Sequence, residues 1–289
     1  MGHQMFDLGD LPLAKGGMLE NAALAFQTYG ALNNARDNCI LLPSYFTGTH
    51  RSYEPMIGPG KALDPERYYI VCPNMFGNGL SSSPSNYPSD IGASPPKLFP
   101  GVTVADNVRA QHRLMERLGV DQMALVAGWS VGAIQSYAWA MLYPEMVKRL
   151  MPWCGSAQCW PLNRVFLDGL RSIILTDPQF AYGDKRGHHE RALRAFGRNY
   201  AGWAYSAKFY RDRLYVGLGF QNQEQFLEWW EDDHVAWHAE DLLAQIHIWQ
   251  SATPFYADIG VDLSSVKSKT TVVCCDTDRY FTLEEDAIE

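Results

Sequence analysis

The sequence contains no long hydrophobic run, no excess of basic residues and no signal peptide. No apolar stretch approaches the roughly 18–20 residues that span a bilayer, which argues against an integral membrane protein and a membrane partner. Lysine and arginine number 24 against 32 aspartates and glutamates, and the net charge is −8. A nucleic-acid-binding surface would need a basic excess, so a nucleic-acid partner is not expected. The first residues also lack the basic-then-apolar pattern of a secretory leader.

Cysteine is scarce, with six residues in 289, and none forms a CxxC pair or stands at zinc-like spacing from a histidine. Reduced core thiols in a cytoplasmic protein are therefore expected. His234 and His238 stand four residues apart, but no glutamate follows His234 as a metalloprotease motif requires. We predict no metal site, and no motif indicates a nucleotide, flavin or other cofactor.

The chain is rich in apolar residues, which make up 47% of the sequence against 19% charged residues, so a sizeable core is expected. Short apolar runs bounded by turn residues predict buried strands. Amphipathic segments between them predict helices. The strands are expected at 22–29, 38–44, 68–72, 122–127 and 147–153, and the helices at 103–118 and 132–143. This alternation predicts a mostly parallel, doubly wound α/β sheet.

Residues 160–252 break the alternation, because they contain helical patterns and no strand-like run. We predict that they form a helical lid inserted into a core made of residues 1–159 and 253–289. The sheet is expected to resume with the apolar run 270–275.

The segment Gly128-Trp129-Ser130-Val131-Gly132 is a GxSxG pattern between a predicted strand and a predicted helix. That context is typical of a nucleophile elbow, in which a sharp turn exposes the serine hydroxyl at the carboxyl end of the sheet. The glycines are needed because side chains there would clash with neighbouring backbone. The alternative is a glycine-rich strand–helix turn that buries an ordinary serine.

Several long stretches resemble the homoserine O-acetyltransferase-like branch of the α/β-hydrolases. They are VAGWSVGAIQSYAWAMLYPEMVKR, DNVRAQHRLMERLG, FGNGLSSSPSN and DLLAQIHIWQ, and the resemblance runs from about Phe6 to the last residue. It implies an α/β-hydrolase fold and an acyl-serine intermediate formed on Ser130. The acetyltransferases carry Gly-Gly-Ser-Met-Gly-Gly, whereas this elbow differs at Trp129, Val131 and Ala133, which favours a subgroup of acetyltransferase-like hydrolases.

An oxyanion hole needs two backbone N–H groups aimed at the developing negative charge. One is expected from Val131, directly after the candidate nucleophile. The resemblance aligns Phe46, in the loop 44–49, with the second donor. The alternative for this loop is a plain glycine turn.

The catalytic acid is expected after a late strand. Asp276 and Asp278 both follow the run 270–275. The family pattern of an aspartate followed by a Tyr-Phe or Leu-Phe pair matches Asp278-Arg279-Tyr280-Phe281, so we choose Asp278. Either aspartate could instead be a solvated turn or helix-cap residue.

Three arginines, Arg191, Arg194 and Arg198, share one face of a predicted lid helix. The resemblance aligns Arg198 with an arginine near the amino-acid carboxylate in the acetyltransferases, so we predict a substrate-binding role for it. A guanidinium suits that role because it pairs with a carboxylate in a bidentate fork. A solvated basic helix face is the alternative.

The general base is the missing part of the pattern, because no histidine follows His247. We therefore expect a chain truncated before the histidine loop. The leading prediction is acyl transfer through Ser130, from acetyl-CoA or an ester to a hydroxy amino acid such as homoserine. The alternatives are hydrolysis of carboxylic esters, and an inactive binding protein or fragment. The partners expected are a small-molecule acyl donor and acceptor. The sequence leaves the oligomeric state open, with a homodimer as one candidate.

Overall fold

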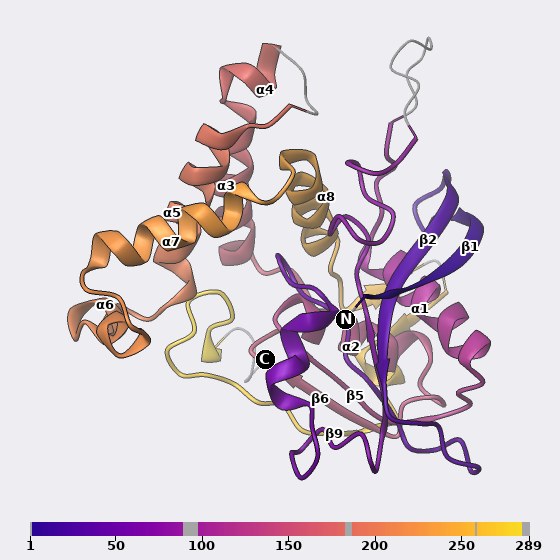
Figure 1. The fold of residues 1–289 in the computed structure, drawn as a ribbon. Helices are drawn as coiled ribbons and strands as arrows, with labels where there is room; N and C mark the ends of the chain where they lie inside the picture. Colours follow the sequence, from indigo (N-terminus) through magenta and orange to yellow (C-terminus); the bar gives the residue numbers. More distant parts are fainter. Residues whose placement is uncertain (1, 89–97, 183–186, 258, 285–289) are drawn as a thin grey trace.

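The computed structural model describes residues 2–88, 98–182, 187–257 and 259–284 (Figure 1). Its main sheet has seven strands in the order β1-β2-β4-β3-β5-β6-β9. The strands are β1 (Gln4–Pro12), β2 (Met18–Tyr29), β3 (Cys39–Leu41), β4 (Tyr69–Pro73), β5 (Met123–Trp129), β6 (Arg149–Trp153) and β9 (Lys269–Thr270). The β1–β2 and β2–β4 pairs are antiparallel and all other pairs are parallel. The predicted mostly parallel, doubly wound sheet is confirmed.

The outermost strand, β1, lies outside the predicted elements. Its pairing with β2 shifts register between Asp7 and Gly9 and again between Gly9 and Leu11. These irregularities break the period of two on which strand prediction depends, so residues 4–12 do not alternate cleanly.

Helices α1 (Val104–Leu118) and α2 (Val131–Leu142) connect the parallel strands. Thr103 and Asp106 form a capping box at the start of α1, and Gly119 ends the helix with φ +72°. Most of α2 is buried, as expected for a helix that starts at the centre of the sheet and packs against both β5 and β6.

The late strand is shorter than predicted, because β9 ends at Thr270 instead of Cys275. The backbone nevertheless continues beside β6: Thr271 N–H donates to Leu150 O at 2.9 Å, and Val273 N–H donates to Pro152 O at 3.0 Å. Side chains 271–274 are exposed, so this edge lacks the packing that would extend a regular strand.

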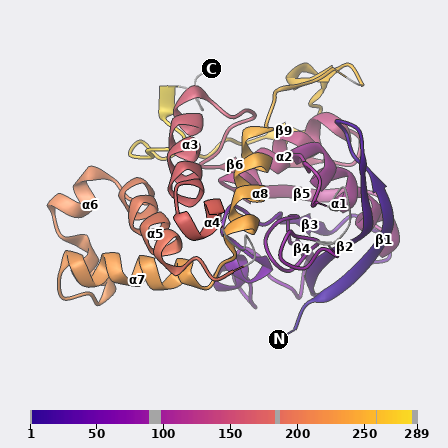
Figure 2. The same cartoon turned by 90° about the horizontal axis from the view of Figure 1, so that it is seen from above.

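Between β6 and the hairpin β7 (Phe255–Tyr256) and β8 (Val261–Asp262), the described residues form helices and no strand. These are α3 (Pro161–Leu175), α4 (Pro178–Tyr182), α5 (Glu190–Ala204), α6 (Ala207–Arg211), the 3₁₀ helix η2 (Leu214–Leu218), α7 (Gln223–Val235) and α8 (Ala239–Gln250). Figure 2 shows α3 to α7 to one side of the sheet, with α8 between them and the core. The division into core and lid stays a prediction. None of the helices among the described residues has the length and hydropathy to cross a membrane.

Candidate active site

Ser130 occupies the sharp turn between β5 and α2, so the predicted strand–turn–helix context is present. Its backbone has φ +57° and ψ −123°, a conformation that L-residues other than glycine rarely adopt. Ser130 N–H donates to Trp153 O at 3.2 Å, which ties the turn to the end of β6. The side chain makes no helix-cap hydrogen bond, although serine is a common cap. Strain of this kind is stored at functional sites, where surrounding contacts hold the backbone in place.

Three glycines make this turn sterically possible. A Cβ on Gly128 would lie 2.3 Å from the carbonyl carbon and oxygen of Gly132. A Cβ on Gly132 would lie 2.6 Å from Pro43 O, and one on Gly155 would lie 2.6 Å from Ser130 O. All of these distances are well below van der Waals contact, so β5, α2 and the loop after β3 can approach only without side chains.

The loop after β3 forms a tight turn beside the elbow. Gly48 N–H donates to Tyr45 O at 2.8 Å, and Thr47 has φ +56°. Gln135 of α2 donates through Nε2 to Ser44 O at 2.7 Å, which fixes the start of the loop against the helix that Ser130 begins. Among the described residues, no acceptor receives the backbone N–H of Phe46 or Val131. Both predicted oxyanion-hole donors are therefore free to bind an oxyanion, and their role stays a prediction.

Tyr53 connects the same loop to the elbow, a link that the sequence analysis missed. Its hydroxyl donates to Pro43 O at 2.9 Å and accepts Trp129 N–H at 3.2 Å. The ring is completely buried, and burial raises the pKa of the phenol far above its usual range. Tyr53 lies in the 3₁₀ helix η1 (His50–Met56), and no motif marks it, because its partners are backbone atoms distant in sequence.

Asp278 lies on the loop that follows β9, beside the end of β6. Cys154 N–H donates to Val273 O at 2.9 Å, so this segment continues next to the strand that neighbours β5. Asp278 Oδ1 accepts Tyr280 N–H at 2.8 Å and Phe281 N–H at 3.0 Å. Burial raises the pKa of the Asp278 carboxyl, and the backbone donors oppose that rise.

The two candidate aspartates differ in their surroundings. Asp276 is exposed, whereas Asp278 is partly buried and held by backbone N–H groups. A triad acid needs a fixed orientation, so the structure favours Asp278 over Asp276. Burial also raises the pKa of the neighbouring Cys154 thiol to about 12, which leaves it protonated and a poor nucleophile at neutral pH.

Three of the histidines make contacts away from the elbow. His50 lies against Asn74, His112 stacks on Tyr143 with ring centroids 3.9 Å apart, and His234 Nδ1 is 2.9 Å from Trp230 O. Within the described ranges, no hydrogen bond joins an imidazole to Ser130 or Asp278. The described residues also contain no group of three or more His, Cys, Asp and Glu side chains arranged to hold a metal. The catalytic roles of Ser130 and Asp278 stay predictions.

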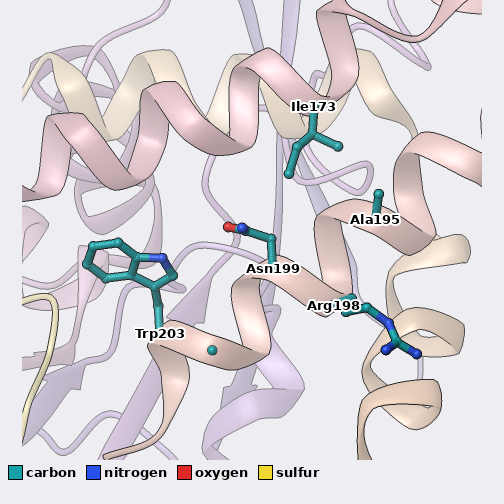
Figure 3. Close-up of a pocket in the computed structure, with 6 residues that line it drawn as sticks. Ile173, Ala195, Arg198, Asn199 and Trp203 are labelled. Carbon is teal, nitrogen blue, oxygen red and sulfur yellow. The ribbon is translucent and has the colours of Figure 1, made fainter. Parts of the chain in front are cut away.

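Arg198 lies on α5 and forms ion pairs with Glu224 and Glu231 of α7. It borders an open groove between α3 and α5 with Ile173, Ala195, Asn199, Gly202 and Trp203, and its guanidinium points away from Asn199 and Trp203 (Figure 3). These carboxylates raise the pKa of Arg198 and compensate its charge. No contact among the described residues brings Arg198 to the Ser130 turn, and its substrate-binding role stays a prediction.

A strained serine turn on a doubly wound sheet is typical of the α/β hydrolases. Comparison with known proteins gives the same class. The model of the alpha/beta hydrolase fold family matches residues 40–286, so the chain belongs to this family. The ethyl acetate hydrolase of Pseudomonas veronii is 34% identical, over 98% of this chain and 82% of that protein. The crystal structure of an acetylester hydrolase from Corynebacterium glutamicum superposes with a TM-score of 0.91 at 32% identity, over 98% and 83% of the two chains. The chain is an enzyme of this fold.

The homoserine O-acetyltransferases are also relatives, at lower similarity. The enzyme of Methanobrevibacter ruminantium is 28% identical, over 95% of this chain and 62% of its own length. The acyltransferase reading, which the sequence analysis placed first, is therefore less well supported than the esterase alternative.

Proposed function

We propose that this enzyme is a serine hydrolase of small carboxylic esters, acetyl esters above all. The observation that carries the proposal is the similarity to an ethyl acetate hydrolase and an acetylester hydrolase along almost the whole chain. The strained Ser130 turn supplies the matching chemistry, because it presents a hydroxyl at the carboxyl end of the parallel strands.

In the proposed reaction, Ser130 Oγ attacks the ester carbonyl, and its proton passes to an imidazole base, which returns it to the leaving alcohol. The N–H groups of Phe46 and Val131 stabilise the tetrahedral oxyanion. The alcohol leaves with a proton, an acetyl-serine forms, and water then releases acetate and restores the hydroxyl. Asp278 orients the base and stabilises its charged form. Among the described residues, no histidine is positioned to take the proton from Ser130.

The surroundings of the elbow agree with an ester substrate. Trp129 is 47% exposed, and its ring centroid lies 5.5 Å from that of Tyr45 in the loop 44–49, the candidate oxyanion loop. An exposed tryptophan beside the nucleophile offers an apolar surface to a small ester. It offers no charge to an amino-acid carboxylate, which a homoserine-type acceptor would need bound.

Acyl transfer to a hydroxy amino acid is the second candidate. The similarity to homoserine O-acetyltransferases favours it. The compensated charge of Arg198 weakens it, because both acidic partners would have to release the guanidinium before it bound a carboxylate.

The test is acetylation of Ser130 by p-nitrophenyl acetate, followed by intact mass spectrometry and acetate release, with and without added imidazole. We expect one acetyl group per chain, absent from Ser130→Ala, and release of acetate to water. Coenzyme A release from acetyl-CoA that depends on homoserine would instead establish the transferase. No acetylation of Ser130 under either condition would refute both.

A further inference from the structure

One side chain of the lid segment reaches the candidate oxyanion loop from a distance of nearly 200 residues. Gln245 of α8 is completely buried. Its Oε1 accepts Thr47 N–H at 2.9 Å, and its Nε2 donates to Gly77 O at 3.0 Å. A buried amide with both ends in use holds its two partners at fixed separation, because freeing either would leave an unsatisfied polar group.

The turn that Gln245 contacts needs such a partner. The Gly48 N–H bond to Tyr45 O closes it, and Thr47 is its third residue. A turn with positive φ at this position, as in type II, normally carries glycine there. Thr47 has φ +56° and a β-branched side chain, so its backbone is strained in this turn. Rotation of the Phe46–Thr47 peptide would relieve this strain, and it would also break the bond from Thr47 N–H to Gln245.

The same helix also contacts the ring of the candidate donor residue. Phe46 is buried, with its ring centroid 5.6 Å from that of Trp249, four residues after Gln245 on α8. The ring of Phe46 also lies 5.6 Å, between centroids, from that of Tyr200 of α5. The lid helices therefore hold both the side chain of Phe46 and the peptide that follows it, so the residue that carries the candidate donor is restrained at both places.

Close approach of two backbones allows Gln245 to reach both partners. Gly77 has φ +79°, and a Cβ there would lie 3.1 Å from the Cβ of Ala244. Two further hydrogen bonds hold α8 one turn earlier. The carboxylate of Asp241 accepts them from the N–H and the hydroxyl of Ser85, at 2.9 and 2.6 Å. Among the described residues, neither Asp241 nor Ser85 is hydrogen-bonded to the loop 44–49, so this pair is a matched control for the same helix.

We propose that Gln245 is a positioning residue, which fixes the Tyr45–Gly48 turn in its strained form and so keeps Phe46, whose N–H is the candidate oxyanion donor, in place beside the elbow. The inference rests on the proposed function, because it assigns Gln245 a role in ester cleavage. It also makes a claim about the resting enzyme: among the described residues, Gln245 is the hydrogen-bond acceptor that protects the Thr47 amide.

The test compares Gln245→Leu with Ser85→Ala in the full chain. The first readout is hydrogen exchange of the Thr47 amide, measured by NMR. We expect about tenfold or greater acceleration in Gln245→Leu and none in Ser85→Ala. The second is the rate of Ser130 acetylation by p-nitrophenyl acetate with added imidazole. We expect a fall of about 10- to 100-fold in the maximal rate with little change in half-saturating ester, since the donor acts on the transition state.

Gln245→Glu is the conservative variant. Its buried carboxyl stays protonated, accepts Thr47 N–H and donates to Gly77 O, so it should restore most of the acetylation rate. Unchanged Thr47 exchange in Gln245→Leu would overturn the proposal, as would faster exchange with an unchanged acetylation rate. Wild-type chain that never acetylates would refute the proposed function and the catalytic part of this inference, while the exchange would still show whether Gln245 holds the turn.

Discussion

Replacement of Gly128 by alanine tests the central steric claim about the elbow. The new Cβ would lie 2.3 Å from the carbonyl carbon and oxygen of Gly132 and 2.9 Å from Ala133 N. Ordinary contacts between carbon atoms are about 3.5–4.0 Å, so the overlap with the carbon exceeds roughly 1 Å. All three partners are backbone atoms, and no side-chain rotation can relieve the clash.

The cost is expected at the upper end of the range for overpacked sites, about 3 kcal/mol in the free energy of unfolding. For a domain of this size that corresponds to a fall in Tm of about 5 °C. Separation of β5 from α2 also displaces Ser130, and a shift of about 1 Å at a reacting group costs on the order of 100-fold in rate. We therefore expect loss of Ser130 acetylation beyond the loss of stability.

The assays are denaturant unfolding and the acetylation rate of Ser130 at a temperature where both proteins are folded. Gly169→Ala is the matched control, because Gly169 lies within α3 with nothing within 4 Å of the new Cβ. Alanine there should stabilise the protein by about 0.5–1 kcal/mol and leave acetylation unchanged. Wild-type stability and acetylation in Gly128→Ala would refute the description of the turn.

The remaining predictions concern the base, the arginine and the acid. Added imidazole should accelerate acetylation of Ser130 by about tenfold or more, because no histidine among the described residues reaches this serine. Rapid acetylation at a rate independent of added imidazole would show that a base is already in place. Arg198→Ala should cost less than about 1 kcal/mol in unfolding and leave ester cleavage unchanged, whereas a raised KM for a carboxylate-bearing acceptor would support acyl transfer. Burial raises the pKa of Asp278 above its ordinary value of 3.8, so the folded state keeps this proton to higher pH than the unfolded state does. As pH rises from the pKa of Asp278 in the unfolded state to its pKa in the folded state, the wild type should lose stability relative to Asp278→Asn in denaturant titrations. A stability difference that does not change with pH would contradict the raised pKa of Asp278.

The order of elements could be predicted from the sequence because it depends on local signals. Buried parallel strands appear as short apolar runs, and the Thr103 capping box and Gly119 mark the ends of α1. The GxSxG pattern located Ser130 for the same reason, since the turn requires glycine within two residues on either side. The β1 strand was missed because bulges interrupt its alternation, and β9 was overestimated because an apolar run does not reveal whether anything packs on it.

The surroundings of the candidate site were decided by tertiary structure. Tyr53 and Gln245 carry no sequence signal, because each bonds to backbone atoms supplied by distant segments. Arg198 has the residue type that binds a carboxylate, but its actual partners, Glu224 and Glu231, come from a helix more than twenty residues away. Residue types and local spacing thus determined the class of chemistry, through a serine on a sharp turn. Which backbone groups are held, and which charges are already paired, depends on contacts that form only when the helices after β6 pack against the sheet.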